Sequence, residues 1–309
     1  MVLGNSLQAR ATAHGMQSPH WKPRVSVSIR EFGELVRLPH IVAWADIVLL
    51  NAGHIDLEED EVDTMIVPIL DVSPLLQELH LHENRLRDPG IAQLARALPS
   101  CPLLVHLNVG RNHLTGVGMT ALAVQLPALQ RLEVLDLSSN QIEFAGAQAL
   151  AGVLAQLPSL LELDLSHNLL QAQGSEVIAN VLPFCTKLST LDLTDNSLGI
   201  TDDAEVLAAA LPQCNSLTIV RLAHNYLRDN SASVLADFLP HCELLQSLNL
   251  AHNYIGDPGA MDIAAVLPRC PALTNLEMRA NFIAVDGDMG LRAAAEECPW
   301  MTIDIVDND

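Results

Sequence analysis

Aromatic residues are scarce in this chain, which has three Trp, two Tyr and five Phe among 309 residues. A single thick core usually takes much of its buried area from aromatic rings. Half of the residues are nevertheless apolar, which argues against a disordered chain. The core must therefore be built from Leu, Ala, Val and Ile. This composition favours many small repeated layers.

Basic residues are also few. The chain has 16 Lys and Arg against 37 Asp and Glu, a formal net charge of −21 at pH 7. Such a body repels nucleic-acid phosphates and anionic membranes, so we expect neither as a partner. A partner attracted electrostatically should instead present a basic surface. Alternatively, the charge only keeps the protein soluble.

Long apolar runs are missing as well. No uninterrupted stretch reaches the roughly 18 apolar residues that indicate a transmembrane helix. The N-terminus also lacks the apolar core and cleavage site of a secretory signal. Residues 1–30 contain four basic residues and no acid, as organelle transit peptides do. Trp21 and "VSVSI" from Val25 indicate instead the start of folded structure. We expect a cytoplasmic protein, or an organelle protein if this segment is a targeting signal.

What the chain does have is one 11-residue pattern, L-x-x-L-x-L-x-x-N-x-L, repeated eight times. Successive Asn residues of the pattern are 28 residues apart, with one step of 29. This Asn column consists of Asn84, Asn112, Asn140, Asn168, Asn196, Asn225, Asn253 and Asn281. A truncated copy, "WMTIDIVDND", places Asn308 in the same column. A degenerate early copy, "AWADIVLLNAGHI" (43–55), places Gly53 there.

The pattern predicts one strand and one helix in each copy. Its alternating Leu residues indicate a short strand with the Leu side chains pointing inward. The Asn amide can satisfy backbone groups where the chain leaves the strand. Segments such as "GAQALAGVLAQLPSL" have helical spacing and end at Leu-Pro, because proline cannot continue a helix. Helices are wider than strands, so the stack should curve with the strands on its concave side.

These repeats resemble the leucine-rich repeat family, specifically its ribonuclease-inhibitor-like class with long 28-residue units. The resemblance covers residues 41–309. It implies an α/β fold: a right-handed, horseshoe-shaped solenoid of about nine to ten units, with parallel strands on the concave face and helices on the convex face. Residues 1–40 are then an N-terminal extension and cap. We expect Trp21, Trp44 and Trp300 to cover the ends of the stack.

The cysteines occupy one repeat position, ten or eleven residues before a column Asn: Cys101, Cys185, Cys214, Cys242, Cys270 and Cys298. A single repeat position indicates a packing role, not a disulfide framework or a CxxC metal site. The family consensus also has Cys here. Free buried thiols imply a reducing compartment.

Histidines gather on the first two full strands. Alternate strand residues share a face, so Glu78, His80, His82 and His106 should all point into the concavity. Three imidazoles and a carboxylate could hold zinc. No HExxH or comparable motif accompanies them, so we predict a solvated polar surface without metal or cofactor. Other histidines, each directly before a column Asn, are interpreted as a turn preference: His167, His224 and His252.

The concave face carries a row of acids on three consecutive strands, Asp136, Asp164 and Asp192, with Glu162 beside them. Positions between the fixed leucines are free to bind partners. Neighbouring strands lie about 4.8 Å apart, so these like charges repel and a basic partner would relieve them. Alternatively, "LDLS" is only a common filling of the repeat. The predicted binding face also includes His80, His82 and Arg221.

The only two tyrosines also share a repeat position. Tyr226 and Tyr254 each follow a column Asn, and Phe282 follows the next one. This position lies at the rim, where the strand becomes a loop. Aromatic side chains give large contact areas at low entropic cost. Duplication of "AHNY" could explain the tyrosines but not Phe282, which lies in "RANFI". We predict a binding edge.

No motif indicates catalysis, since there is no phosphate loop and no nucleophile elbow. We therefore predict a non-enzymatic scaffold or adaptor that binds a partner protein through the acidic concave face and the aromatic rim. Residues 115–130 and 144–161 contain no charged residue, which hints at packing inside a larger complex.

The alternative is a GTPase-activating protein resembling the Ran GTPase activators, which are similar acidic solenoids. That family relies on an arginine and asparagines in early-repeat loops, and Arg85 and Arg111 are the candidates here. The family's loop motif and long acidic tail are not matched. Ciliary proteins also use this repeat class, so the cytoskeleton of a cilium or flagellum is a further possible location.

Overall fold

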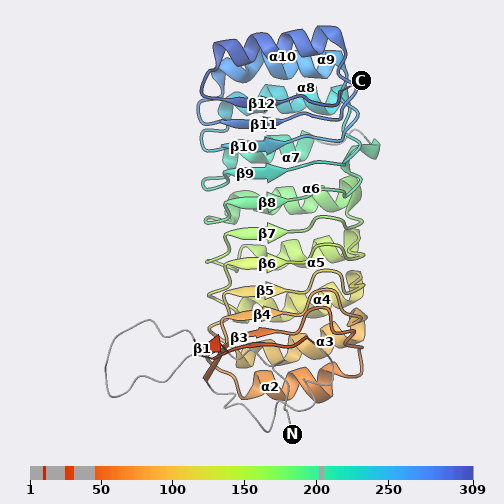
Figure 1. Ribbon diagram of the computed structural model, residues 1–309, viewed down its shortest axis with the longest axis vertical. Coiled ribbons are helices and arrows are strands. Elements are labelled where there is room, and N and C mark those ends of the chain that lie inside the picture. The colour runs from red at the N-terminus through yellow and green to blue at the C-terminus, as the bar shows by residue number, and fades with distance from the viewer. Residues whose placement is uncertain (1–9, 12–24, 31–45, 202–204, 309) are drawn as a thin grey trace, which may run out of the picture.

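The computed structural model describes residues 10–11, 25–30, 46–201 and 205–308, and every structural statement below refers to these residues. They form one sheet of twelve strands arranged in chain order, with helices stacked along one side of it (Figure 1). The pair β1–β2 is antiparallel, and each later neighbouring pair is parallel. The predicted α/β solenoid is confirmed.

Each coil of the stack contributes one strand. The strands are β1 (Arg10–Ala11), β2 (Val25–Ser28), β3 (Ile47–Asn51), β4 (Glu78–His80), β5 (His106–Asn108), β6 (Val134–Asp136), β7 (Glu162–Asp164), β8 (Thr190–Asp192), β9 (Ile219–Arg221), β10 (Ser247–Asn249), β11 (Asn275–Glu277) and β12 (Thr302–Asp304). Equivalent repeat positions pair directly, as Leu79 does with Leu107 and Asp136 with Asp164. The 29-residue step keeps this register, because Asp192 pairs with Arg221.

The helices return the chain along the outer side. They are α2 (Val67–Asp71), α3 (Arg87–Ala97), α4 (Gly116–Gln125), α5 (Phe144–Leu154), α6 (Gln171–Val181), α7 (Glu205–Ala210), α8 (Asp229–Phe238), α9 (Asp257–Val266) and α10 (Val285–Glu297). Six of them run directly into a 3-10 turn that begins with Leu-Pro, for example Leu98–Ser100 after α3. The predicted stops at Leu-Pro are confirmed for these six helices, whereas α5 ends at Leu154, before Leu157 and Pro158.

The core is a single apolar cluster that extends from Val27 to Met301. The fixed leucines of every full repeat are buried in it. Strand β2 lies within the predicted cap and continues the parallel sheet, while the boundary at residue 40 stays a prediction. Trp21 and Trp44 lie outside the described residues. Trp300 is 51% exposed, and its capping role stays a prediction.

The column Asn residues form an asparagine ladder between the coils. Asn140 shows the pattern. Its Oδ1 accepts from the backbone N–H groups of Asn112 and Leu114 in the preceding coil, each at 3.0 Å. Its Nδ2 donates to the carbonyls of Leu137 at 2.9 Å and Val109 at 3.1 Å. These backbone groups are buried and would otherwise be unpaired.

The other ladder members bridge their own coils in similar ways: Asn84, Asn112, Asn168, Asn196, Asn225, Asn253 and Asn281. Asn308 ends the ladder by accepting from the N–H of Asn281 at 2.7 Å, which confirms its predicted place in the column.

The early degenerate coil differs from the prediction by two residues. Leu50, not Val48, pairs with Leu79, and Asn84 Oδ1 accepts from the N–H groups of Ile55 and Leu57. Ile55 therefore occupies the Asn position, and the placement of Gly53 there was wrong. Val48, Leu50 and Ala52 alternate, so two registers that differ by two residues both fit the apolar spacing.

All six cysteines are free, five of them buried and Cys214 half-buried. The Cys270 thiol donates to the Val266 carbonyl at 3.4 Å. Burial raises the pKa of Cys101 to about 12 and that of Cys185 to about 11. The predicted packing role is confirmed.

Removing one ladder amide should destabilise the stack. Asn140→Ala leaves two buried N–H groups and two carbonyls without this partner, so we expect the free energy of unfolding to fall by about 3 kcal/mol. Gln141→Ala removes an exposed amide from the next residue and should change it by less than about 0.5 kcal/mol. Urea unfolding followed by circular dichroism measures both, and equal effects would contradict the ladder's role.

The thiols should resist modification in the folded protein. A raised thiol pKa leaves little thiolate at pH 8, so reaction with a disulfide reagent should be about 100-fold slower than in guanidinium, where all six titrate. Cys214 should react first, and Cys214→Ser should remove that phase. Rapid titration of several native thiols would contradict the buried packing.

Candidate functional site

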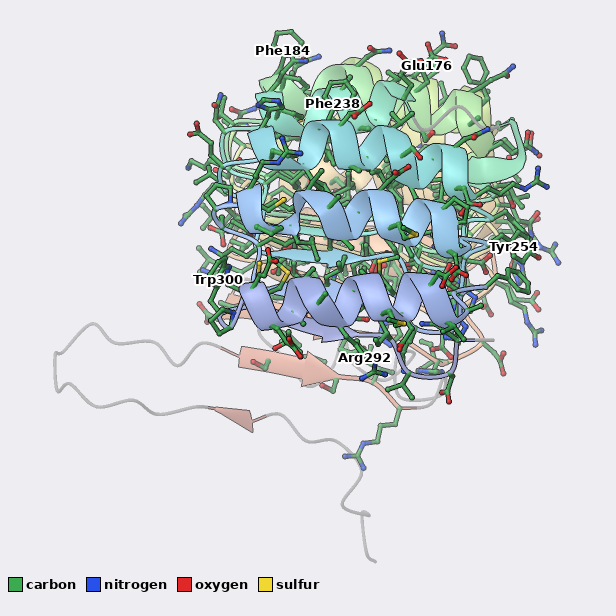
Figure 2. The ribbon with its side chains drawn as sticks, turned by 90° about the horizontal axis from the view of Figure 1, so that it is seen from above. Glu176, Phe184, Phe238, Tyr254, Arg292 and Trp300 are labelled. Carbon is green, nitrogen blue, oxygen red and sulfur yellow. The ribbon has the colours of Figure 1, made fainter. Side chains whose placement is uncertain are left out.

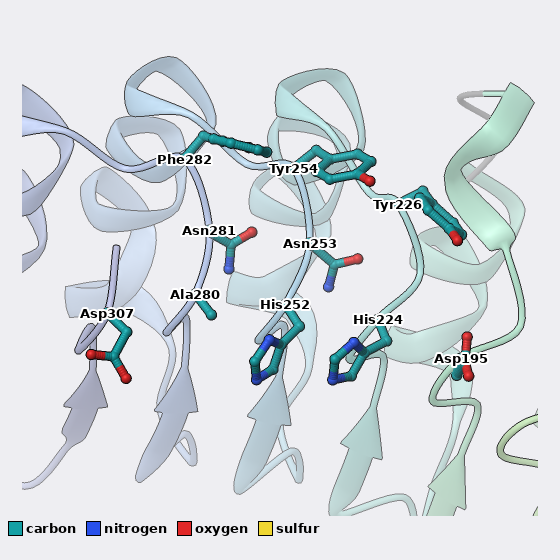
Figure 3. A pocket seen from close by; sticks show the side chains of 10 residues that line it. All are labelled: Asp195, His224, Tyr226, His252, Asn253, Tyr254, Ala280, Asn281, Phe282 and Asp307. Atoms are coloured by element: carbon teal, nitrogen blue, oxygen red, sulfur yellow. The ribbon is translucent and has the colours of Figure 1, made fainter. Parts of the chain in front are cut away.

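Three aromatic side chains form a continuous row on the rim of the stack, at the edge where the strands end. The ring centroids of Tyr226 and Tyr254 are 5.5 Å apart, and those of Tyr254 and Phe282 are 5.4 Å apart. The three residues are 41%, 43% and 58% exposed. Sequence alignment predicted this row, and the structure brings the rings into mutual contact (Figure 3). Their role in binding stays a prediction.

A pair of imidazoles lies opposite the aromatic row. The rings of His224 and His252 stack with centroids 4.1 Å apart and an interplanar angle of 9°. Figure 3 shows them on the strand side of the loops, below the aromatic rings. Burial, and then the neighbouring His252, lowers the pKa of His224, so protonation of His224 is disfavoured.

The backbone explains why histidine occupies this place. His167, His224 and His252 have φ of 55°, 56° and 56°. This left-handed conformation is one that His adopts more readily than most side chains. The predicted turn preference is therefore confirmed. Two of these histidines, His224 and His252, also line a groove, which was not predicted from the sequence although "AHNY" repeats the histidine together with the tyrosine.

Between the two rows lies an open groove of about 440 Å³, called the rim groove here. It is lined by Asp195, His224, Tyr226, His252, Asn253, Tyr254, Ala280, Asn281, Phe282 and Asp307. Carboxylates stand at both ends of the groove, Asp195 at one and Asp307 at the other (Figure 3). The site thus combines aromatic faces, imidazoles and negative charge. Neither carboxylate was singled out from the sequence.

The acid row Asp136, Asp164 and Asp192 is present on β6, β7 and β8. It lines a hollow of about 240 Å³ on the strand face together with Glu162 and Arg221. Burial raises the pKa of Asp164, and the charges of Asp192 and Asp136 raise it further. The predicted repulsion within the row is therefore present.

Each acid of the row also has a local structural task. One oxygen of Asp164 accepts from the N–H of Ser166 at 2.8 Å. In the same way, Asp136 accepts from the N–H of Ser138, and Asp192 accepts from the N–H of Thr194. Asn108 makes it equally well with Gly110. The turn therefore needs an oxygen acceptor but no negative charge.

Arg221 closes the acid row at one end, with its guanidinium 3.6 Å from Asp192. At the other end lie Glu78, His80 and His106 on β4 and β5. His80 and His106 have ring centroids 4.5 Å apart. Burial, followed by the charge of His80, lowers the pKa of His106.

His82 is separate from this group. Its ring lies over Gly53, where a Cβ would come 2.5 to 2.8 Å from three ring atoms. Its Nδ1 is buried without a hydrogen-bond partner. Burial lowers the pKa of His82. His82 lies beyond the end of β4, with its ring centroid 6.4 Å from that of His80, and its predicted part in binding stays a prediction.

The two arginines considered for GTPase activation are paired within the chain. Arg85 lies 3.1 Å from Asp56 and 3.6 Å from Glu58, while Arg111 lies 3.5 Å from Glu83. Both face acids of a neighbouring coil.

The uncharged helices α4 and α5 pack side by side on the outer face (Figure 1). Val117 and Val124 of α4 are 73% and 67% exposed. No helix in the described part of the chain is long and apolar enough to span a bilayer.

Comparison with known proteins agrees with this architecture. Family models described as leucine rich repeat match residues 102–170 and 241–264. No curated protein matches the chain significantly. Among the solved structures, 203 chains match.

One of these structures is the leiomodin-1 actin-binding site 2, which is 19% identical. The alignment covers 39% of this chain and 71% of that one, with a TM-score of 0.37. At that TM-score the likeness carries no inference about a partner. The parallel sheet with its outer helices, the asparagine ladder and the two family matches together show that the chain folds as a solenoid of leucine-rich repeats.

Proposed function

We propose that this protein is a non-enzymatic scaffold of the ribonuclease-inhibitor-like class, and that it binds a partner protein through the rim groove and the acid row. Leucine-rich repeat domains generally mediate protein–protein binding. The assignment to this class is supported by the 28-residue period. The observation that carries the proposal is the row of three exposed aromatic rings in mutual contact, which forms one wall of the groove.

The chemistry of the groove favours a basic segment of the partner. A Lys or Arg side chain can lie across an aromatic face within about 6 Å of the ring centroid. Asp195 and Asp307 then provide a carboxylate at each end of the groove. The lowered pKa of His224 disfavours a competing positive charge at that ring.

The acid row extends this surface across the strand face. Asp192 and Arg221 line the hollow there, and Asp195, three residues after Asp192, lines the rim groove. A partner can therefore contact both regions at once. The net charge of −21 increases the rate of encounter with a basic partner and disfavours nucleic acid and membrane surfaces.

Helices α4 and α5 support a second contact on the outer face. Exposed apolar side chains on an uncharged surface suit packing within a larger complex. The free buried cysteines suit a reducing compartment such as the cytoplasm. We keep both as parts of the proposal. GTPase activation is tested directly by assaying GTP hydrolysis with small GTPases, where we expect no acceleration.

Removing the rim aromatics should abolish specific capture. In quantitative affinity purification, the double variant Tyr226→Ala, Tyr254→Ala should lose at least 90% of one stoichiometric partner, because central aromatic anchors carry most interface energy. The matched control is Phe184→Ala, Trp300→Ala. These two exposed aromatics lie toward the edge opposite Tyr254 (Figure 2). An unchanged partner set in the rim variant, or equal losses in both, would contradict the proposal.

The negative charges of the acid row should serve binding and not folding, because the turn needs only an oxygen acceptor. Asp164→Asn keeps the acceptor for the Ser166 N–H, as Asn108 does for Gly110. A raised folded-state pKa means that the charge destabilises the fold above the ordinary Asp pKa. At pH 7 the variant should therefore melt about 1–3 °C higher than the wild type, with no gain near pH 3.

The corresponding binding experiment combines Asp136→Asn, Asp164→Asn and Asp192→Asn. Capture of the partner should weaken and lose much of its dependence on salt, because fewer charges meet across the interface. Unchanged capture would assign these residues to the turn alone.

A further inference from the structure

Two strands bring three metal-ligating side chains together at one end of the acid row. Glu78 and His80 are alternate residues of β4 and share its face. Glu78 pairs directly with His106 on β5. The backbone therefore fixes the relative positions of the three residues. Glu78 and His80 are two residues apart on one strand, and Glu78 and His106 face each other on adjacent strands. Among the described residues, this is the group of His, Cys, Asp and Glu side chains whose ligand atoms lie within 4.8 Å of one another.

The distances are close to those of a zinc site. Zn–N and Zn–O bonds of about 2.0–2.2 Å at tetrahedral angles place ligand atoms about 3.4 Å apart. His80 Nε2 and Glu78 Oε2 already lie 3.4 Å apart. The remaining separations are no more than 4.8 Å and can close by rotation of side chains, with no movement of the backbone.

The supporting structure is rigid on both sides. Strand β4 is paired with β3 as well as β5, and β5 is paired with β6. The side chain of His80 is only 17% exposed, and its ring packs against that of His106. Binding therefore has to order little beyond the partly exposed Glu78.

We propose that Glu78, His80 and His106 bind a divalent zinc ion, which revises the sequence-based expectation of a surface without metal. Two imidazoles and one carboxylate are a borderline ligand set that suits Zn²⁺, and no thiolate is present to favour a softer ion. Three protein ligands leave a fourth position toward the hollow of the strand face, which His106 also lines. Water fills that position, or a ligating side chain of a bound protein replaces it.

The surroundings add electrostatic attraction. Asp136 and Glu162 act on His106 with their negative charge. A divalent cation here would also reduce the repulsion within the acid row. The bound ion would therefore stabilise the charges of the acid row. Its binding does not depend on the rim groove.

The test is calorimetric titration of Zn²⁺ into the full chain, freed of tags and treated with a chelator. We expect one equivalent to bind with micromolar affinity, and His106→Gln and Glu78→Gln each to weaken binding at least ten-fold. Four-coordinate Co²⁺ should give intense visible absorption in the wild type but not in His106→Gln.

The matched control is His224→Gln, which removes a histidine of the stacked pair outside this cluster and should leave zinc affinity unchanged. Circular dichroism should show that all variants are folded. The proposal is overturned if zinc does not bind, if His106→Gln binds it as tightly as the wild type, or if His224→Gln weakens binding to the same extent.

Discussion

The asparagine ladder is the interaction on which the rest of this structure depends. A chain that leaves a strand and turns inside an apolar stack exposes backbone N–H and carbonyl groups to a medium without water. Each ladder Asn satisfies such groups in its own coil and in the preceding one, as Asn140 does with Leu137 and Val109. Each buried amide left unpaired would cost about 1–3 kcal/mol. The ladder therefore makes each coil a template for the next.

The rim groove and the acid row both follow from this strict register. When equivalent positions align, any residue type repeated at one position becomes a row in space. Tyr226, Tyr254 and Phe282 form a wall in this way, and the stacking of His224 on His252 has the same origin. The rim groove is thus formed by residues that occupy equivalent positions in successive repeats.

The sequence predicted the repeat architecture, the ladder and the aromatic row, because all three depend only on position within the period. It failed where the period weakens. In the early coil, the alternation of Val48, Leu50 and Ala52 allowed two registers, and hydrogen bonds to Asn84 decide between them. It also could not predict the groove, because the side of a turn on which His224, Asp195 and Asp307 lie depends on backbone torsion. The unpaired Nδ1 of His82 could not be predicted either, since strand β4 ends with His80 and the torsions of the turn orient the ring.

The residue before each Asn of the ladder has a positive φ, from Glu83 through His224 to Asp307. β-branched side chains are strongly disfavoured in that conformation, and none of these positions in the chain carries Val, Ile or Thr. One wall of the groove can therefore diversify during evolution only among unbranched residues. A descendant of this protein could exchange imidazole for carboxylate, amide or guanidinium there and acquire a new ligand preference. It could not readily acquire a lining of β-branched apolar side chains.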